Sequence, residues 1–256
     1  MDETYQTYIN RVTKLTRPLT CLNQLQNVQE SPKFKQGEAI AFPGYTVSSP
    51  TCNLDSQNKI FYTHLETARG ELLEKIGEGL LVPVPIDSFH LTIADLIWDS
   101  DYRDAIAEDE TFELKLRDRV DSSFEHYQQS MPERCPVSLQ LLGIAVRPRA
   151  IEACLVSKDE ESHNRLLQLR RALYQERGLI ALGVRQQYHY TAHITLAYFG
   201  GGVESFDRDW FCEVLTDFND RWTDSHEILT FDRAELYKFD DMTHFYREPD
   251  FPFVHF

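Results

Sequence analysis

The sequence has few cysteines, few basic residues for its acidic content and no long apolar run. Its five cysteines are scattered and none belongs to a Cys-x-x-Cys pair, so neither a zinc cage nor a disulfide framework is expected. No apolar stretch approaches the ~20 residues that a membrane-spanning helix needs. Residues 1–6 lack the basic start and apolar centre of a secretory signal. These absences predict a cytoplasmic protein without a membrane partner.

The charge balance restricts the class of partner. Lysine and arginine number 26 against 41 aspartates and glutamates, a formal net charge of −15. Proteins that hold long nucleic acids do so largely through basic patches on the phosphates. A long nucleic acid is therefore not expected, whereas a small nucleotide or a short RNA end fits a locally basic pocket. Nothing in the 256 residues requires more than a monomer.

Two stretches of the sequence are alike: residues 88–94 read SFHLTIA and residues 191–197 read TAHITLA. Each is an apolar run with a histidine and, two residues later, a threonine. Side chains two apart on a β-strand share a face, and the residue between them points the opposite way, towards a core. Two such strands side by side would place four polar side chains in one cleft: His90, Thr92, His193 and Thr195.

The flanking sequence predicts the same order of elements before each stretch. A short strand at 45–47 and a helix at 60–77 precede the first; strands at 137–146 and 151–157 and a helix at 159–177, stopped by Gly178, precede the second. Helices are also expected within 99–129 and at 206–222, and short strands at 230–231, 234–239 and 244–246. Residues 1–36 are predicted to form an N-terminal extension, which packs across the molecule or frays, and residues 37–256 a single bilobal domain. The last residues, 251–256, are expected to dock on its surface.

Two imidazoles and two hydroxyls suit proton transfer around a phosphate. An unperturbed histidine titrates near pH 6.5, so one of a pair can accept a proton while the other donates one. Threonine hydroxyls can donate to the non-bridging oxygens as charge develops. This scheme needs no metal and no cofactor. The alternative is that both histidines are half-buried sheet residues bonded to their neighbours.

The motifs His90-Leu91-Thr92-Ile93 and His193-Ile194-Thr195-Leu196 resemble those of the 2H phosphoesterase superfamily, which includes the LigT-like RNA 2′,3′-cyclic phosphodiesterases. The longer string 188–193, YHYTAH, is similar to a little-characterised bacterial branch of that superfamily, a domain of unknown function. The resemblance implies an α+β fold of two pseudo-symmetric lobes, each an antiparallel sheet with packed helices, around an active-site cleft. It also implies that the two His-Thr pairs are catalytic and act without metal at a 2′,3′-cyclic or 2′-linked phosphodiester. Residues 1–36, the tract 99–130 and the acidic balance depart from the small RNA-processing members.

Four further residues are candidate substrate contacts. His189 shares a strand face with His193, so it either reaches the substrate, orients His193, pairs deeper in the sheet, or forms a zinc pair with it. Trp98 and Tyr198 either stack on a base or pack. Arg147 is one of several arginines that can supply a cation to the phosphate. Tyr188 and Tyr190 are expected to pack on the opposite face.

The sequence therefore predicts a metal-independent hydrolase of a cyclic or 2′-linked nucleotide phosphodiester. Two alternatives remain open at this point. One is a non-catalytic nucleotide- or protein-binding module on the same fold, and the other is a metallohydrolase that uses the histidines at 189 and 193.

Overall fold

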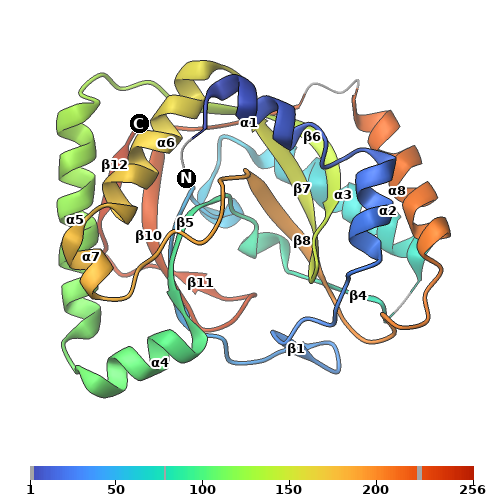
Figure 1. The fold of residues 1–256 in the computed structure, drawn as a ribbon, viewed down its shortest axis with the longest axis horizontal. Helices are drawn as coiled ribbons and strands as arrows, with labels where there is room; N and C mark the ends of the chain where they lie inside the picture. The colour runs from blue at the N-terminus through green and yellow to red at the C-terminus, as the bar shows by residue number, and fades with distance from the viewer. Residues whose placement is uncertain (1–2, 78, 224–226) are drawn as a thin grey trace.

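A computed structural model describes residues 3–77, 79–223 and 227–256 (Figure 1). Its helices are α1 (Tyr5–Val12), α2 (Pro18–Leu25), α3 (Lys59–Ile76), α4 (Asp99–Glu108), α5 (Phe112–Ser130), α6 (Glu160–Tyr174), α7 (Arg177–Ala181) and α8 (Arg208–Thr223). Its strands are β1 (Phe34–Lys35), β2 (Glu38–Ala39), β3 (Gly44–Ser48), β4 (Leu81–Pro83), β5 (Thr92–Trp98), β6 (Val137–Val146), β7 (Ala150–Ser157), β8 (His193–Phe199), β9 (Ile228–Phe231), β10 (Arg233–Phe239), β11 (Phe245–Tyr246) and β12 (Phe253–His255).

Two antiparallel five-stranded sheets form the two lobes. The first has the order β11-β10-β3-β5, with β12 also paired to β10, and the second has the order β4-β8-β7-β6-β9. In Figure 1 the first sheet lies on the left with α4 to α7, and the second on the right with α2, α3 and α8. Each sheet carries one of the two His-Thr stretches, on β5 and on β8. The bilobal α+β fold predicted from the sequence is confirmed.

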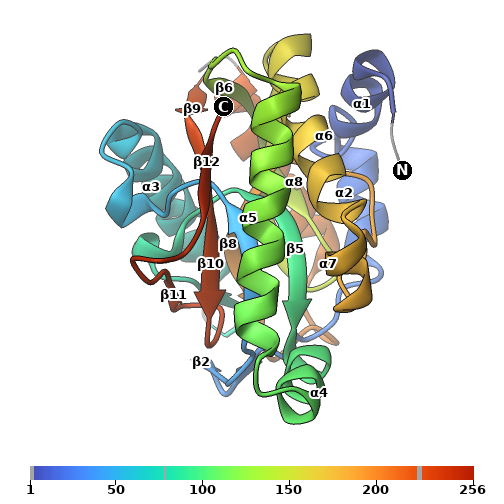
Figure 2. The same cartoon turned by 90° about the vertical axis from the view of Figure 1, so that its left-hand side faces the viewer.

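The helix that precedes each His-Thr strand contacts the opposite lobe. α3 follows β3 of the first sheet, yet Asn58 at its start donates to the carbonyl of Thr230, on β9 of the second sheet, over 2.7 Å. α6 follows β7 of the second sheet, yet the hydroxyl of Tyr174 donates to the carbonyl of Asp95, on β5, over 2.9 Å. α6 also contacts its own lobe, where the Ser162 hydroxyl accepts from the N–H of Ser138, on β6, over 3.1 Å, so this helix bridges the two sheets (Figures 1 and 2). A single cluster of buried apolar side chains runs through both.

The N-terminal segment packs on the molecule. Tyr8 and Val12 of α1 are fully buried, and the Tyr8 hydroxyl accepts from the backbone N–H of Ser157, the last residue of β7, over 3.2 Å. Pro18, which breaks the helical pattern in the sequence, is the first residue of α2, where a missing N–H costs nothing. The N-terminal segment therefore packs against the second lobe through α1.

Two predictions, on the end of the long helix and on the C-terminal residues, are wrong. Gly178 does not stop the long helix: α6 ends at Tyr174, and Gly178 lies inside α7, which the Glu176 side chain caps by accepting from the N–H of Leu179. The C-terminal residues do not dock on the surface either. Phe251 and Phe256 are 4% and 2% exposed, because β12 extends the first sheet and carries this end of the chain into the core.

Candidate active site

The two histidines lie at equivalent places in the two lobes. His193 is the first residue of β8, whereas His90 immediately precedes β5, which begins at Thr92. Both histidine and threonine side chains are partly exposed in each motif. The residues between them, Leu91 and Ile194, are fully buried, as the strand pattern predicts.

Each histidine is held through Nδ1 by the backbone two residues before it. Nδ1 of His90 donates to the carbonyl of Ser88 over 2.7 Å, and Nδ1 of His193 donates to the carbonyl of Thr191 over 2.9 Å. A carbonyl oxygen can only accept, so the proton of each neutral ring is on Nδ1 and Nε2 is the basic nitrogen. The same device at both motifs leaves both Nε2 atoms available for proton transfer.

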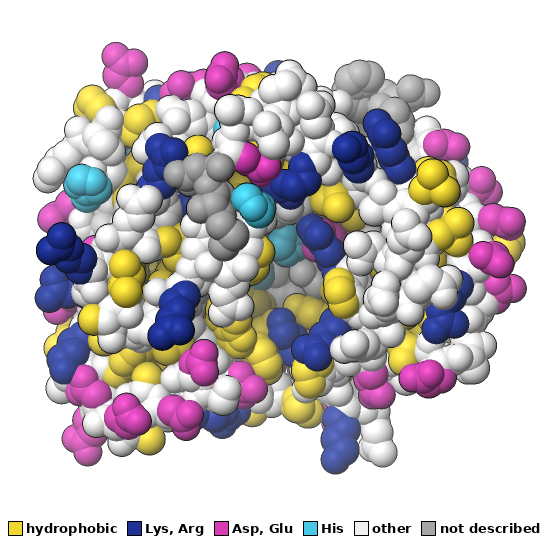
Figure 3. Space-filling view, in the orientation of Figure 1, with side chains coloured by type: hydrophobic (Ala, Val, Ile, Leu, Met, Phe, Trp, Pro, Cys, Tyr) yellow, Lys and Arg dark blue, Asp and Glu magenta, His cyan; other side chains and the backbone are white. Residues whose placement is uncertain are grey.

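Both motifs line one cavity of about 460 Å³ between the lobes. Figure 3 shows a hollow near the centre of this face, with histidine side chains inside it and Lys or Arg side chains around it. All eight residues singled out in the sequence line this cavity: His90, Thr92, Trp98, Arg147, His189, His193, Thr195 and Tyr198. The cavity also takes in Lys33, Asp95, Glu152 and Tyr188, which the sequence pattern did not indicate.

Matched β-bulges bring Asp95 and Tyr198 to the cavity. Strict alternation from either threonine places the residue three positions later on the core side. In the first sheet the pairing with β3 skips Ile93, and in the second the pairing with β7 skips Leu196. A bulge adds one residue and reverses the alternation beyond it. Asp95 and Tyr198 therefore lie at equivalent positions on the cavity side, each three residues after its threonine.

The segment before the second motif is a loop and not part of the strand. His189 is exposed at the cavity and so does not pair within the sheet. Tyr188 was expected to pack on the opposite face, and this expectation is wrong: without strand geometry its ring reaches the cavity, and its hydroxyl donates to Oδ2 of Asp95 in the other lobe. Tyr190 does pack, 8% exposed, with the guanidinium of Arg170 4.9 Å from its ring centre.

Two cations and two carboxylates face the cavity. Arg147 donates through Nε to Oε1 of Glu152 over 2.6 Å, and Oε2 of Glu152 is 3.7 Å from Nε2 of His193. The Lys33 ammonium lies over the ring of Tyr198, 5.1 Å from its centre. Glu152 therefore lies between Arg147 and His193 on the second-lobe side of the cavity.

Burial shifts the pKa values of two cavity residues, His90 and Asp95. The pKa of His90 is lowered to about 4, mainly by burial; a positive charge on His193 acts in the same direction, and the hydrogen bond to the Ser88 carbonyl opposes both. His90 is consequently neutral at neutral pH. Burial also raises the pKa of Asp95, while the positive charges of His193, Lys33 and Arg170 oppose that shift.

Within residues 3–77, 79–223 and 227–256, no group of three or more His, Cys, Asp or Glu side chains is arranged to hold a metal ion. His189 and His193 thus lack, in this part of the chain, the further ligands that a zinc site requires. None of the described helices is long and apolar enough to cross a membrane.

Comparison with known proteins identifies the fold. No protein-family model and no curated protein matches the chain. Among solved structures, the conserved protein of unknown function ATU0111 from Agrobacterium tumefaciens aligns with a TM-score of 0.58 at 15% identity, over 85% of this chain and 90% of its own. The two proteins share a fold.

Two further solved structures align with lower TM-scores. TT0787 of Thermus thermophilus aligns with a TM-score of 0.45 at 14% identity, over 82% of this chain and 93% of its own. E. coli LigT complexed with 3′-AMP aligns with a TM-score of 0.39 at 12% identity, over 84% of this chain and 95% of its own. At such identities the comparisons show an arrangement of elements, so the activity has to be argued from the cavity itself.

Proposed function

We propose that this protein is a metal-independent phosphodiesterase of the 2H type that hydrolyses a 2′,3′-cyclic or 2′-linked nucleotide phosphodiester. One observation supports the proposal above others: two histidines from two lobes, both fixed through Nδ1 to the carbonyl two residues earlier, line one cavity together with two threonines. Half-buried sheet histidines without a shared task would have no reason to repeat the same tautomer in two lobes.

The reaction needs one base and one acid. One imidazole takes a proton from water through Nε2 as the water oxygen bonds to phosphorus. The other imidazole, protonated, gives its Nε2 proton to the ribose oxygen as the phosphorus–oxygen bond breaks. Thr92 and Thr195 donate to the non-bridging oxygens, where negative charge accumulates. Exchange with solvent then restores the two protonation states.

The size and charge of the cavity favour a small substrate with a single phosphodiester. A volume of about 460 Å³ is within the usual range for small-molecule sites. Lys33 and Arg147 are balanced by Asp95 and Glu152, so the lining adds no excess of positive charge that would attract a polyphosphate. The cavity supplies rings for a base, including Trp98 and Tyr198. The proposal retains the expectation of a cytoplasmic monomer.

The test is a panel of phosphodiesters: the four nucleoside 2′,3′-cyclic phosphates, a short RNA with a cyclic phosphate end, and a 2′,5′-linked dinucleotide. We expect turnover of at least one, with the products identified by mass and by the position of the phosphate. His90→Ala and His193→Ala should each lower kcat by roughly 10²- to 10⁴-fold.

His126→Ala is the matched control, because His126 is exposed on α5 and does not line the cavity. EDTA should leave the rate unchanged. Full activity in either cavity variant, or loss of activity on chelation, would contradict the mechanism. Binding of these compounds without any turnover would favour a binding module.

A further inference from the structure

Glu152 is a carboxylate in an otherwise apolar strand. It lies on β7 directly opposite Thr195 of β8, and the residue is 3% exposed although it lines the cavity. Burying a carboxylate is unfavourable unless other groups compensate its charge, so its partners indicate why it is there.

Those partners are an arginine and a histidine. Arg147 donates to Oε1 over 2.6 Å from the turn between β6 and β7, where its own N–H bonds to the carbonyl of Ala150 over 2.8 Å. Oε2 faces Nε2 of His193 at 3.7 Å. That separation is short enough for an ion pair and too long for a hydrogen bond. A proton on Nε2 is therefore stabilised by Glu152 without being bonded to it, and remains able to move to a substrate oxygen.

The other histidine has a different environment. The ring of His90 packs against Phe245, with the ring centres 4.3 Å apart, and among the described residues His90 has no ion pair of the kind that Glu152 gives His193. The apolar contact disfavours a charged ring, and its low pKa agrees with this. The two lobes thus repeat the hydrogen bond at Nδ1 and differ at Nε2.

We propose that Glu152, held by Arg147, is a positioning residue that keeps His193 as the proton donor, which makes His90 the base. The assignment rests on the proposed phosphodiesterase function and adds the direction of proton flow to it. In that direction His90 takes the proton of the attacking water, and His193 protonates the oxygen whose bond to phosphorus breaks. The titratable groups that face His193 are Glu152 from β7, Asp95 from β5 and His90, which precedes β5.

Substrates with a bridging sulfur separate the two roles. A thiolate leaves phosphorus without protonation, so a 2′- or 3′-bridging phosphorothiolate version of the cyclic substrate removes the need for an acid but not for a base. We expect His193→Ala to be severely impaired on the oxygen ester and close to wild type on the sulfur ester that matches the cleaved bond. His90→Ala should be impaired on both.

Glu152→Gln should lower kcat on the oxygen ester by roughly 10- to 100-fold, with most of the loss recovered on the sulfur ester. Glu235→Gln is the matched control: Glu235 is likewise 3% exposed and bonded to an arginine, Arg233, over 2.8 Å, but lies outside the cavity lining.

The outcomes are separable. If the wild-type protein turns over none of the phosphodiesters, the proposed function fails before Glu152 is at issue. If the wild type is active and Glu152→Gln keeps the kcat of Glu235→Gln on the oxygen ester, or its loss is not recovered on the sulfur ester, the role of Glu152 is refuted. If the sulfur ester rescues His90→Ala instead of His193→Ala, the direction of proton flow is reversed and the proposal is overturned.

Discussion

The guanidinium of Arg11 donates through Nη1 to the hydroxyl of Thr191 over 2.9 Å, although 180 positions separate the two in sequence. The same side chain donates through Nη2 to the carbonyl of Tyr190 over 2.5 Å. The carbonyl of Thr191 in turn accepts from His193. Helix α1 is therefore connected, through one residue, to the imidazole of the second motif.

Arg11→Ala should lower kcat/KM by roughly tenfold or more, since a hydrogen bond from a charged donor is worth about 1.5–3 kcal/mol and two are lost at the residues that orient His193. The measurement is steady-state turnover of the best substrate beside urea unfolding. Arg17→Ala removes an exposed arginine nearby and serves as the control. Equal kinetics in the two variants would show that α1 has no influence on the site.

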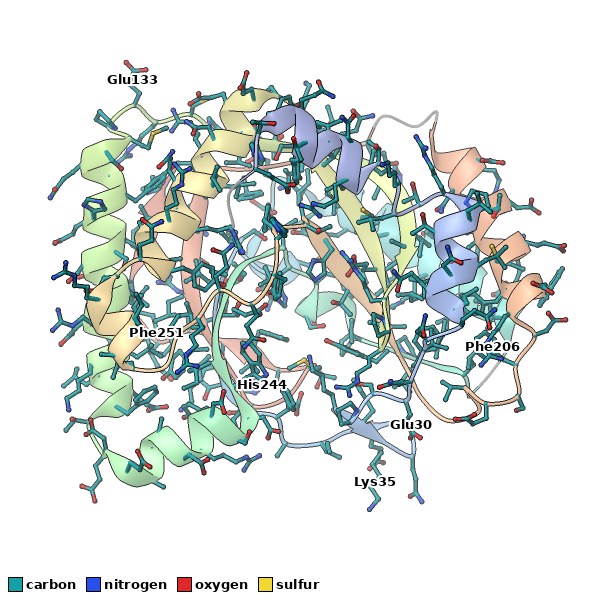
Figure 4. The ribbon with its side chains drawn as sticks, in the orientation of Figure 1. Glu30, Lys35, Glu133, Phe206, His244 and Phe251 are labelled. Carbon is teal, nitrogen blue, oxygen red and sulfur yellow. The ribbon has the colours of Figure 1, made fainter. Side chains whose placement is uncertain are left out.

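Lys33 provides a second link between the N-terminal segment and the cavity. Lys33→Gln should raise KM by roughly 3- to 10-fold and reduce the sensitivity of kcat/KM to salt, because a cation close to the phosphate site is lost. Lys35→Gln is the control, since Lys35 is exposed on β1 and points away from the molecule in Figure 4. An unchanged KM for Lys33→Gln would place the substrate away from Tyr198.

Much of the fold could be predicted from the sequence because apolar periodicity and turn residues report local structure. The strand predicted at 137–146 and the helices predicted at 60–77 and 159–177 are examples, although the last one ends at Tyr174; the burial of Leu91 and Ile194 is another. The two His-Thr pairs were found because they repeat. Their placement on one cavity agrees with the expected geometry, whereas their catalytic roles stay a prediction.

The cavity residues that the sequence did not indicate were missed for physical reasons. Asp95 faces the cavity only because a β-bulge after Thr92 reverses which side chains point to the cavity. The apolar alternation in the sequence does not reveal such a bulge. Glu152 was hidden in an apolar run, although a lone carboxylate there was a usable signal. Lys33 and Tyr188 lie outside the regular elements that carry the motifs, so only tertiary packing places them.

The hydroxyl of Tyr188 links its loop to Asp95 in the opposite lobe. Tyr188→Phe should raise KM several-fold with a smaller change in kcat, because the loop that carries His189 loses its polar contact across the cavity while the histidines and threonines are untouched. Tyr246→Phe serves as the control. The hydroxyl of Tyr246 donates to Asp240 over a distance of 3.3 Å, and neither residue lines the cavity. A fall in kcat at constant KM would assign Tyr188 to the chemical step instead.

Stability should depend on pH through His90. Its pKa is about 4 in the folded protein against 6.5 ordinarily, so between these values the unfolded chain binds a proton that the folded protein does not. The free energy of unfolding therefore rises with pH across this window, by up to about 3 kcal/mol from this group. The lowered pKa of His163 acts in the same sense, and the raised pKa of Asp95 in the opposite one.

Urea unfolding of the wild type and of His90→Gln at pH 4.5 and pH 7 measures this contribution. The difference between the two pH values should be smaller in the variant, and His126→Gln, at an exposed position, should behave as the wild type. A variant with the full wild-type difference would mean that His90 is protonated at the same pH in the folded and unfolded protein.

The contacts that α3 and α6 make with the opposite lobes connect the two repeats of the chain. Each sheet is bonded to a helix that belongs in sequence to the other repeat, so a half-chain would lose a helix that its sheet contacts in the complete chain. The two repeats are thus not independent folding units, despite their symmetry. Unfolding should be a single cooperative event, and a protease that removes either half should leave no partly competent remnant, because the two imidazoles meet only in the complete chain.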